Sequence, residues 1–366
     1  MKNKVVYILG AGCSANYGYP LAKDFREALR EYGGALEQRP NCERLTQCVT
    51  KTIRLMEKYQ SPTIDRLVRQ IDDDLERERR TLGGTVTQAR IQSEKMEDEQ
   101  ILDAKRATTA FLLEREVNAR KTGLQGYRDF LDIIFGGSRD PSVLASTTSR
   151  VLSFNYDRLF EIAFAGYFRL DHTAECYRQF WLNSSLDLLC RQAVDLDRNR
   201  FSFLKLHGTA GIFVAREIGS SRYAGLALHD SSRTIADNLF WPPNPTASSR
   251  QGESAEPLIA FPFEKDRARS GGTSFLFDDY IRAIWGQPGQ QGYAETFVQE
   301  ANQIRVIGYS FDPNDRKAMI DLLRKSADSP IIIRNRTKEQ AQDICQELGE
   351  DYPDLAPRLK PSPKPF

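Results

Sequence analysis

The sequence has few histidines and no closely paired cysteines, which limits the metal sites that it can form. Its 366 residues include 3 histidines and 6 cysteines. No two cysteines have the Cys-x-x-Cys spacing typical of structural zinc sites, and no two histidines have close ligand spacing. We therefore expect no bound metal and, in particular, no zinc module.

The sequence also lacks an excess of charge of either sign and has no long apolar run. Lys and Arg total 51 and Asp and Glu total 50, so the formal charge is +1. No overall field attracts a nucleic acid or an anionic membrane. No run approaches the roughly 18 apolar residues of a membrane helix, and the N-terminus does not resemble a signal peptide. We expect a cytoplasmic protein with reduced thiols, no membrane association and no direct nucleic-acid binding.

The chain does have the composition of an ordinary globular protein, with 40% hydrophobic and 28% charged residues. Its length predicts a core domain with an inserted or appended part. An apolar run over 5–9 predicts a buried strand, and the glycine-rich turn 10–20 follows it. Apolar residues at helical spacing then predict a helix over 21–32.

Strands and helices alternate in the second half of the chain. The apolar runs predict strands at 150–154, 203–206, 258–263, 304–308 and 331–333. The helical spacings predict helices at 276–285, 293–302, 314–326 and 338–348. Such alternation predicts an α/β fold, a Rossmann-like doubly wound parallel sheet whose ligands bind at the carboxyl ends of the strands.

Residues 43–135 show no clear strand and predict a large helical insertion. Within it, residues 85–120 look amphipathic, which fits either a solvated helical cap or a surface for an oligomer or partner. The expected organisation is a Rossmann-like domain over 1–42 and 136–350, a helical subdomain over 43–135, and a loose proline-rich tail over 351–366.

The first motif, Gly10-Ala11-Gly12-Cys13-Ser14-Ala15, has the spacing of the dinucleotide fingerprint and lies between a strand and a helix. Its glycines let the backbone approach a pyrophosphate, whose charge the helix N-terminus stabilises. A tight structural turn is the alternative. A dehydrogenase would need an acidic residue at the end of a second strand, whereas Glu27 and Glu31 fall inside the helix.

Two further motifs follow expected strands. Asn155-Tyr156-Asp157 precedes a helix, where Asn or Asp is also typical of an N-cap. His207-Gly208 follows the next strand, and its imidazole could face a cleft or be a structural core residue. His172 and His229 lack such a setting, and we interpret both as structural or surface residues.

The last two motifs lie at later strand ends. Gly308-Tyr309-Ser310 is another strand–turn–helix joint, where small residues permit a phosphate or ribose to approach. A plain loop is the alternative. Asn335 follows the last expected strand, and its amide could bind a ribose.

Together and in this order, these motifs resemble the sirtuin-like (silent-information-regulator) family. The family's G-A-G-x-S and nearby G-x-P match Gly10-Ala11-Gly12-Cys13-Ser14 and Gly18-Tyr19-Pro20. Its Asn-x-Asp, His-Gly and Gly-x-Ser motifs and its late Asn match the four later sites. The resemblance implies two sets of residues: a catalytic set of Asn155, Asp157 and His207, and a nucleotide-binding set of Gly10, Ala11, Gly12, Ser14, Pro20, Gly308, Ser310 and Asn335.

The sequence departs from the family pattern in two ways, which narrow the resemblance to one branch of the family. The sequence lacks the zinc module of protein-deacylating sirtuins, and the segment after the opening motif is expanded into the helical insertion. Both features resemble the bacterial branch that hydrolyses NAD in anti-phage defence. Members of that branch often act as homo-oligomers or beside a HerA-type motor ATPase. The resemblance therefore implies NAD as substrate, a homo-oligomer, and an ATPase of this kind as a partner.

The activity that the resemblance implies is an NAD+ glycohydrolase, which cleaves the nicotinamide–ribose bond to give ADP-ribose and nicotinamide. Asn155 would hold the ribose or the attacking water, Asp157 would order the pocket or the Asn155 loop, and His207 would act as general base. The alternatives are an NAD-dependent protein deacylase and a non-catalytic sensor of NAD or ADP-ribose. The paired carboxylates and lysine of a nuclease are not evident.

Overall fold

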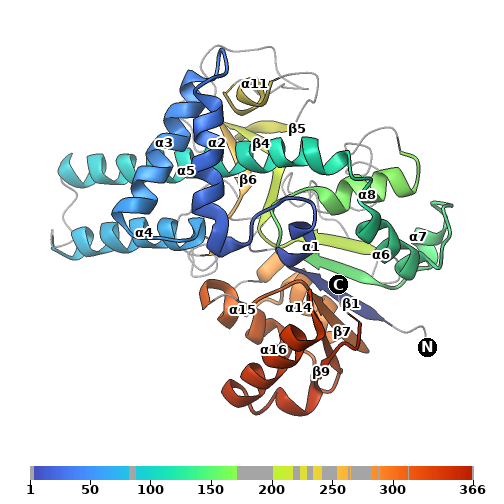
Figure 1. Cartoon of the computed structure of the whole chain (residues 1–366). Helices are drawn as coiled ribbons and strands as arrows, with labels where there is room; N and C mark the ends of the chain where they lie inside the picture. Colours follow the sequence, from blue (N-terminus) through green and yellow to red (C-terminus); the bar gives the residue numbers. More distant parts are fainter. Residues whose placement is uncertain are drawn as a thin grey trace. The chain divides into compact units, whose positions relative to one another are not determined.

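The computed structural model describes residues 4–81, 88–170, 201–216, 223–228, 234–240, 254–262, 264, 282, 284–286, 289–311 and 313–364. Figure 1 shows the course of the chain. Residue contacts divide it into two compact units. The sheet unit comprises Met1–Tyr19, Glu116–Gly208 and Glu264–Phe366, and the helical unit comprises Pro20–Arg115 and Thr209–Phe263.

The sheet unit is built on six strands in the order β3-β2-β1-β7-β8-β9, and every neighbouring pair is parallel. The strands are Val5–Leu9 (β1), Arg150–Ser153 (β2), Ser202–Lys205 (β3), Gln303–Ile307 (β7), Ile331–Arg334 (β8) and Leu359–Pro361 (β9). From β1, the strands β2 and β3 follow on one side of the sheet, and β7, β8 and β9 follow on the other side. This reversal between β1 and β7 is the topological switch point of a doubly wound sheet and confirms the predicted Rossmann-like α/β fold.

Helices flank this sheet and bury its strands (Figure 1). They are α1 (Gly12–Ala15), α6 (Gln125–Phe135), α7 (Val143–Ser146), α8 (Leu159–Tyr167), α14 (Tyr293–Gln299), α15 (Pro313–Arg324) and α16 (Lys338–Asp351). Tyr7 of β1 meets Phe130 of α6 edge to face at 5.0 Å. Phe160 of α8 stacks on Phe203 of β3 at 4.4 Å. Such aromatic contacts hold α6 and α8 against the sheet.

The helical unit contains one set of helices and a second, smaller sheet. The helices are η1 (Ala22–Asp24), α2 (Phe25–Leu36), α3 (Glu43–Lys58), α4 (Ile64–Thr81), most of α5 (Gln88–Arg120) and α11 (Ile235–Phe240). The sheet has the order β5-β4-β6, with β4 (Gly208–Arg216), β5 (Tyr223–Leu228) and β6 (Ser254–Ile259). Strands β4 and β5 are antiparallel and were not predicted, and the strand predicted over 258–263 overlaps β6.

The middle of α5 is a core helix. Residues 104–111 are all buried, although they include Lys105 and Arg106. Lys105 forms an ion pair with Glu256 of β6 at 2.8 Å, and the Arg106 guanidinium lies 5.0 Å from the centre of the Phe240 ring. A helix that is buried on every side belongs to a core. The interpretation of 85–120 as a solvated cap is therefore wrong for this stretch.

The two units do not follow the predicted domain boundaries. The sequence places residues 20–42 in the Rossmann-like domain, but they pack in the helical unit. It places residues 116–135 in the insertion, but they belong to the sheet unit, and residues 209–263 join the helical unit. The physical reason is that the chain passes between units inside continuous elements such as α5, whereas sequence patterns mark only where elements end.

The tail is not loose over residues 351–364, which corrects the prediction for that part of 351–366. After α16, the chain forms the short helix η2 (Ala356–Arg358) and then β9. Leu355 is fully buried, and the Arg358 guanidinium donates to the carbonyls of Ser329 and Leu323 at 3.0 and 3.2 Å. Pro361 is tolerated because β9 is an edge strand, where a missing N–H leaves no neighbour unpaired.

Candidate functional site

The candidate site lies where the carboxyl ends of β1, β2 and β7 meet. Leu9 is the register partner of both Ser153 and Ile307, so the three strands end at the same level. The turns after β1 and β7 bond directly to each other. The Gly10 N–H donates to the Ile307 carbonyl at 2.9 Å, and the Gly12 N–H donates to the Gly308 carbonyl at 2.7 Å.

This close approach explains the glycines of both turns. A Cβ on Gly10 would lie 2.6 Å from the Tyr309 Cα, and a Cβ on Gly12 would lie 2.8 Å from the Gly308 oxygen. Gly308 has a φ of +63°, and a Cβ there would lie 2.5 Å from the Cys13 nitrogen. Any side chain would therefore push the turns apart.

The amides of Gly10 and Gly12 make hydrogen bonds within the fold. The N–H groups of Gly10 and Gly12 donate to protein carbonyls, and helix α1 spans only 4 residues. Ala11 is the exposed residue at the tip of the turn, where a phosphate could reach the backbone. Nucleotide binding by this turn stays a prediction.

Asn155 lies across the β1 turn. Its Nδ2 donates to the Gly10 carbonyl at 3.0 Å and approaches the Ser14 hydroxyl at 3.4 Å. The side chain is buried, and its Oδ1 has no hydrogen-bond partner among the described residues. Helix α8 begins at Leu159 with Arg158 as its N-cap, so the N-cap alternative is wrong for Asn155.

Asp157 and Ser14 form the centre of a buried network. The Ser14 hydroxyl donates to Asp157 Oδ2 at 2.7 Å and lies 3.0 Å from the Tyr127 hydroxyl. Because serine has one proton to donate, Tyr127 and Asn155 must donate to its oxygen. The other carboxylate oxygen of Asp157 accepts the Leu159 N–H at 3.0 Å and so stabilises the start of α8. The hydroxyl of Ser14 is thus fully used in joining α1 to the loop after β2.

Removing the Tyr127 hydroxyl tests this network. We expect Tyr127→Phe to lower the free energy of unfolding by about 0.5–1.5 kcal/mol, because one buried hydrogen bond is lost while the ring still fills its site. Urea unfolding followed by circular dichroism would measure the change. An unchanged midpoint would show that the hydroxyl contributes nothing to the network.

His207 is surrounded by aromatic rings. Its ring centre lies 5.3 Å from that of Phe154, 6.0 Å from Tyr156 and 6.1 Å from Trp285. The Trp285 indole N–H donates to the Leu206 carbonyl at 2.9 Å, which holds the indole beside the strand end. His207 is only 2% exposed. His172 and His229 lie outside the described residues.

Buried ions support the loop that carries Asn155 and Asp157. Glu116 accepts two hydrogen bonds from the Arg158 guanidinium, each at 2.8 Å, and pairs with Arg120 at 2.8 Å. Burial alone would raise the pKa of Glu116, but the charges of Arg158 and Arg120 outweigh it and hold the pKa below its usual value. Burial raises the pKa of Glu161, although the Lys205 ammonium at 3.3 Å opposes this rise.

Three other predicted nucleotide-binding residues, Ser310, Asn335 and Pro20, have no described contact with the network around Ser14 and Asp157. Ser310 is exposed, and Asn335 is half-buried with its Oδ1 accepting the Arg336 N–H at 2.9 Å. Pro20 belongs to the helical unit. Their roles in nucleotide binding stay predictions.

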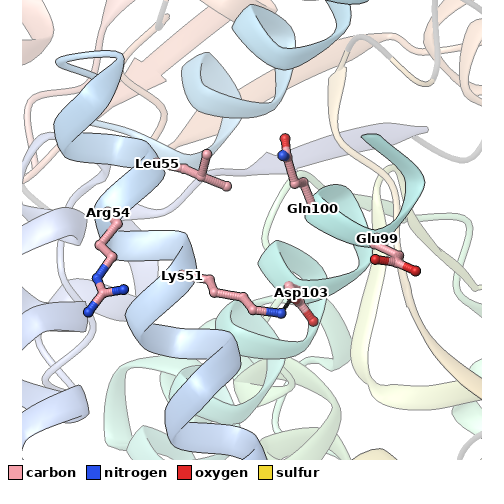
Figure 2. A pocket seen from close by; sticks show the side chains of 6 residues that line it. All are labelled: Lys51, Arg54, Leu55, Glu99, Gln100 and Asp103. Carbon is pink, nitrogen blue, oxygen red and sulfur yellow. Dashed lines mark hydrogen bonds and ion pairs between the residues drawn. The ribbon is translucent and has the colours of Figure 1, made fainter. Parts of the chain in front are cut away.

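Among the residues that the structure describes, each unit has a cavity away from this network. One of about 330 Å³ in the helical unit is lined by side chains of α3 and α5 (Figure 2): Lys51, Arg54, Leu55, Glu99, Gln100 and Asp103. Figure 2 shows Lys51 reaching Asp103, at 3.2 Å. One of about 170 Å³ in the sheet unit lies beside α6 and includes Tyr17, Ile133 and Arg334. Neither contains Asn155 or His207.

Metal-binding and membrane-spanning features were sought in the described part of the chain. No group of three or more His, Cys, Asp or Glu side chains there is arranged to hold a metal ion. No helix there combines the length and the apolar composition needed to cross a bilayer. Comparison with protein-family models and with curated proteins finds no match to this chain.

Sequence reasoning missed several residues of the site. Tyr127 lies in a segment that we assign from the sequence to the insertion, and Glu116 lies in an apparently solvated helix. Lys205 stands two residues before His207 in the same motif, and this spacing could have drawn attention to it. Tyr309 lies in the motif Gly308-Tyr309-Ser310, but the sequence gives its ring no role, and no local pattern marks Trp285, because only the fold brings both rings against Phe154.

Proposed function

We propose that this chain is an NAD+ glycohydrolase that releases nicotinamide and leaves ADP-ribose. The observation that carries the proposal is the amide of Asn155, whose Nδ2 is bound to Gly10 while its buried Oδ1 lacks a donor among the described residues. A buried acceptor of this kind needs a donor, and a ribose hydroxyl or a water supplies one. Its place at the switch point of a doubly wound sheet is where nucleotides bind in such folds.

The arrangement suits cleavage of the bond between ribose C1′ and nicotinamide. As this bond breaks, its electron pair leaves with neutral nicotinamide, so no strong acid is needed and positive charge develops on the ribose. Water attacks C1′, and His207 accepts its proton as general base. Asn155 orients the ribose or the water, while Asp157, through Ser14, holds the Asn155 loop in place.

The rings around His207 support this chemistry in a second way. Phe154, Tyr156 and Trp285 surround the imidazole with apolar surface. A site that excludes bulk water strengthens each polar contact within it. We propose that these rings form a wall of the nicotinamide pocket. The defence role, the homo-oligomer and the HerA-type motor partner rest on the family resemblance alone.

The proposal is tested by measuring nicotinamide and ADP-ribose released from NAD by the purified protein. We expect turnover by the wild type and a loss of at least about 100-fold in Asn155→Ala, the usual scale for a positioned catalytic group. Asn118→Ala is the matched control, because Asn118 is an exposed asparagine of the same unit. Equal turnover by wild type and Asn155→Ala would exclude this mechanism.

The same assay separates the alternatives. Nicotinamide release that requires an acylated peptide would indicate a deacylase. Binding of NAD without turnover, both alone and with a motor ATPase added, would indicate a sensor. Either result would overturn the proposed hydrolase.

A further inference from the structure

Lys205 is a buried ammonium directly behind the candidate site. It is 2% exposed and is the register partner of Ser153, two residues before Asn155. Its Nζ donates to the backbone carbonyl of Asp157 and forms an ion pair with Glu161 Oε1 at 3.3 Å. Lys205 therefore spans from the strand that leads to His207 to the loop that carries Asn155 and Asp157.

A buried lysine is unusual and needs a reason. Lysine is almost never fully buried unless it is paired, because transferring its charge out of water is unfavourable. An apolar residue would fill the end of β3 without that cost, and replacing a buried ion pair by apolar residues is often neutral or stabilising. Packing alone therefore does not explain the pair of Lys205 and Glu161. The bond from Lys205 to the Asp157 carbonyl offers a different explanation.

We propose that Lys205 is a positioning residue, which fixes the Asn155–Asp157 loop relative to His207 by holding the carbonyl of Asp157. The ladder between β2 and β3 continues to the Leu206 N–H, which donates to the Ser153 carbonyl at 2.8 Å, and ends there. Beyond that point, Lys205 provides a further link between the two chain segments. The carboxylate of Glu161 forms an ion pair with the same ammonium, whereas the bond to the Asp157 carbonyl is made by Lys205 itself. The catalytic consequence of this inference rests on the proposed function, but the placement of the loop does not.

The test compares Lys205→Met, the double variant Lys205→Met/Glu161→Met, and Glu161→Gln. Lys205→Met alone leaves a buried carboxylate and is expected to lose stability, so the double variant, which removes both charges, is the informative protein. Glu161→Gln is the control that keeps the bond to Asp157. Two quantities are measured: kcat for NAD cleavage, and hydrogen exchange at the amides of Asn155 and Leu159.

If Lys205 positions the loop, the double variant is as stable as the wild type, yet its amides at 155 and 159 exchange on the order of 10-fold faster. Its kcat then falls at least about 10-fold with little change in KM, because a small misplacement of catalytic groups acts on the chemical step. Glu161→Gln keeps the slow exchange. If the double variant regains both the slow exchange and the wild-type kcat, Lys205 only neutralises Glu161 and the proposal fails.

The two proposals fail separately in this experiment. A wild type that does not cleave NAD, either alone or with a motor ATPase added, overturns the proposed function, and the exchange rates of the folded variants still decide the role of Lys205. A wild type that cleaves NAD, with unchanged exchange and kcat in the double variant, overturns only the positioning role.

Discussion

His207→Ala is expected to reduce NAD turnover between about 100-fold and 10,000-fold, the range for loss of a general acid or base. The imidazole is buried among Phe154, Tyr156 and Trp285, so its removal leaves a space lined by these rings. Free imidazole added to the assay fits such a space. We therefore expect it to restore part of the turnover, increasingly so as the pH rises and more of the added imidazole is neutral.

Asn155→Ala is the control for this rescue, because it lacks an amide rather than a base. Imidazole should leave its low turnover unchanged. A His207→Ala protein that is folded and retains wild-type turnover would remove His207 from the chemistry and support the structural alternative. Rescue of both variants to the same extent would show that imidazole acts directly on NAD rather than at the site of His207.

Glu116→Gln is expected to lower the free energy of unfolding by about 3–5 kcal/mol, because it removes one charge of a buried ion pair. The carboxylate of Glu116 accepts two hydrogen bonds from Arg158, and their side chains are 5% and 3% exposed. Arg158 directly follows Asp157, so the loss should be accompanied by faster hydrogen exchange in this loop. Chemical denaturation with two spectroscopic probes measures the energy.

Glu114→Gln is a closely matched control in the same helix. Glu114 accepts two hydrogen bonds from Arg39, at 3.0 and 2.9 Å, but these side chains are 27% and 43% exposed. The substitution and the change in charge are identical, but the Glu116 pair is buried, and Glu116 also pairs with Arg120. An exposed pair contributes about 0.2–1 kcal/mol, so the control should change stability little. Equal effects of the two variants would contradict the role that we assign to burial.

The Glu116 pair also predicts how stability depends on pH. Because the pKa of Glu116 is held below its usual value near 4.5, its contribution to stability is present above that value. The contribution is lost as the pH falls through the lower pKa of the folded protein. Between pH 5 and acid unfolding, the wild type should therefore lose more stability than Glu116→Gln. Parallel curves for the two proteins would show that the carboxylate has an ordinary pKa in the fold.

The sequence predicts β1, β2, β3, β7 and β8 well because these strands are short and mainly apolar, and most of their residues are buried. Such runs end in turns that have their own residue pattern, as at Gly10 and Gly308, and both turns lie at the switch point. The boundaries of the two units and the partners of buried charged side chains are harder to predict. Residues 104–111 contain charges that find buried partners only in the folded chain, so their composition resembles that of a solvated helix.

The prediction for the tail was wrong and the polar network was not predicted, for related reasons. The prolines of the tail are typical of loose segments, and only the position of β9 at the edge of the sheet makes them compatible with a strand. The link between Ser14, Tyr127 and Asp157 joins residues that are far apart in sequence. Spacing within one motif therefore carries no information about it.

The pairing of the first strand with a strand near residue 305 has a consequence for synthesis. On the ribosome, β1 emerges long before β7, and the turn that packs against Gly10 and Gly12 emerges only with Gly308. Until then the N–H groups of Gly10 and Gly12 lack their carbonyl partners at Ile307 and Gly308. The Gly10 carbonyl, which accepts from Asn155, is therefore not yet held in place. Because contacts of such long range form late, the nascent chain carries all three predicted catalytic residues well before it can assemble the centre.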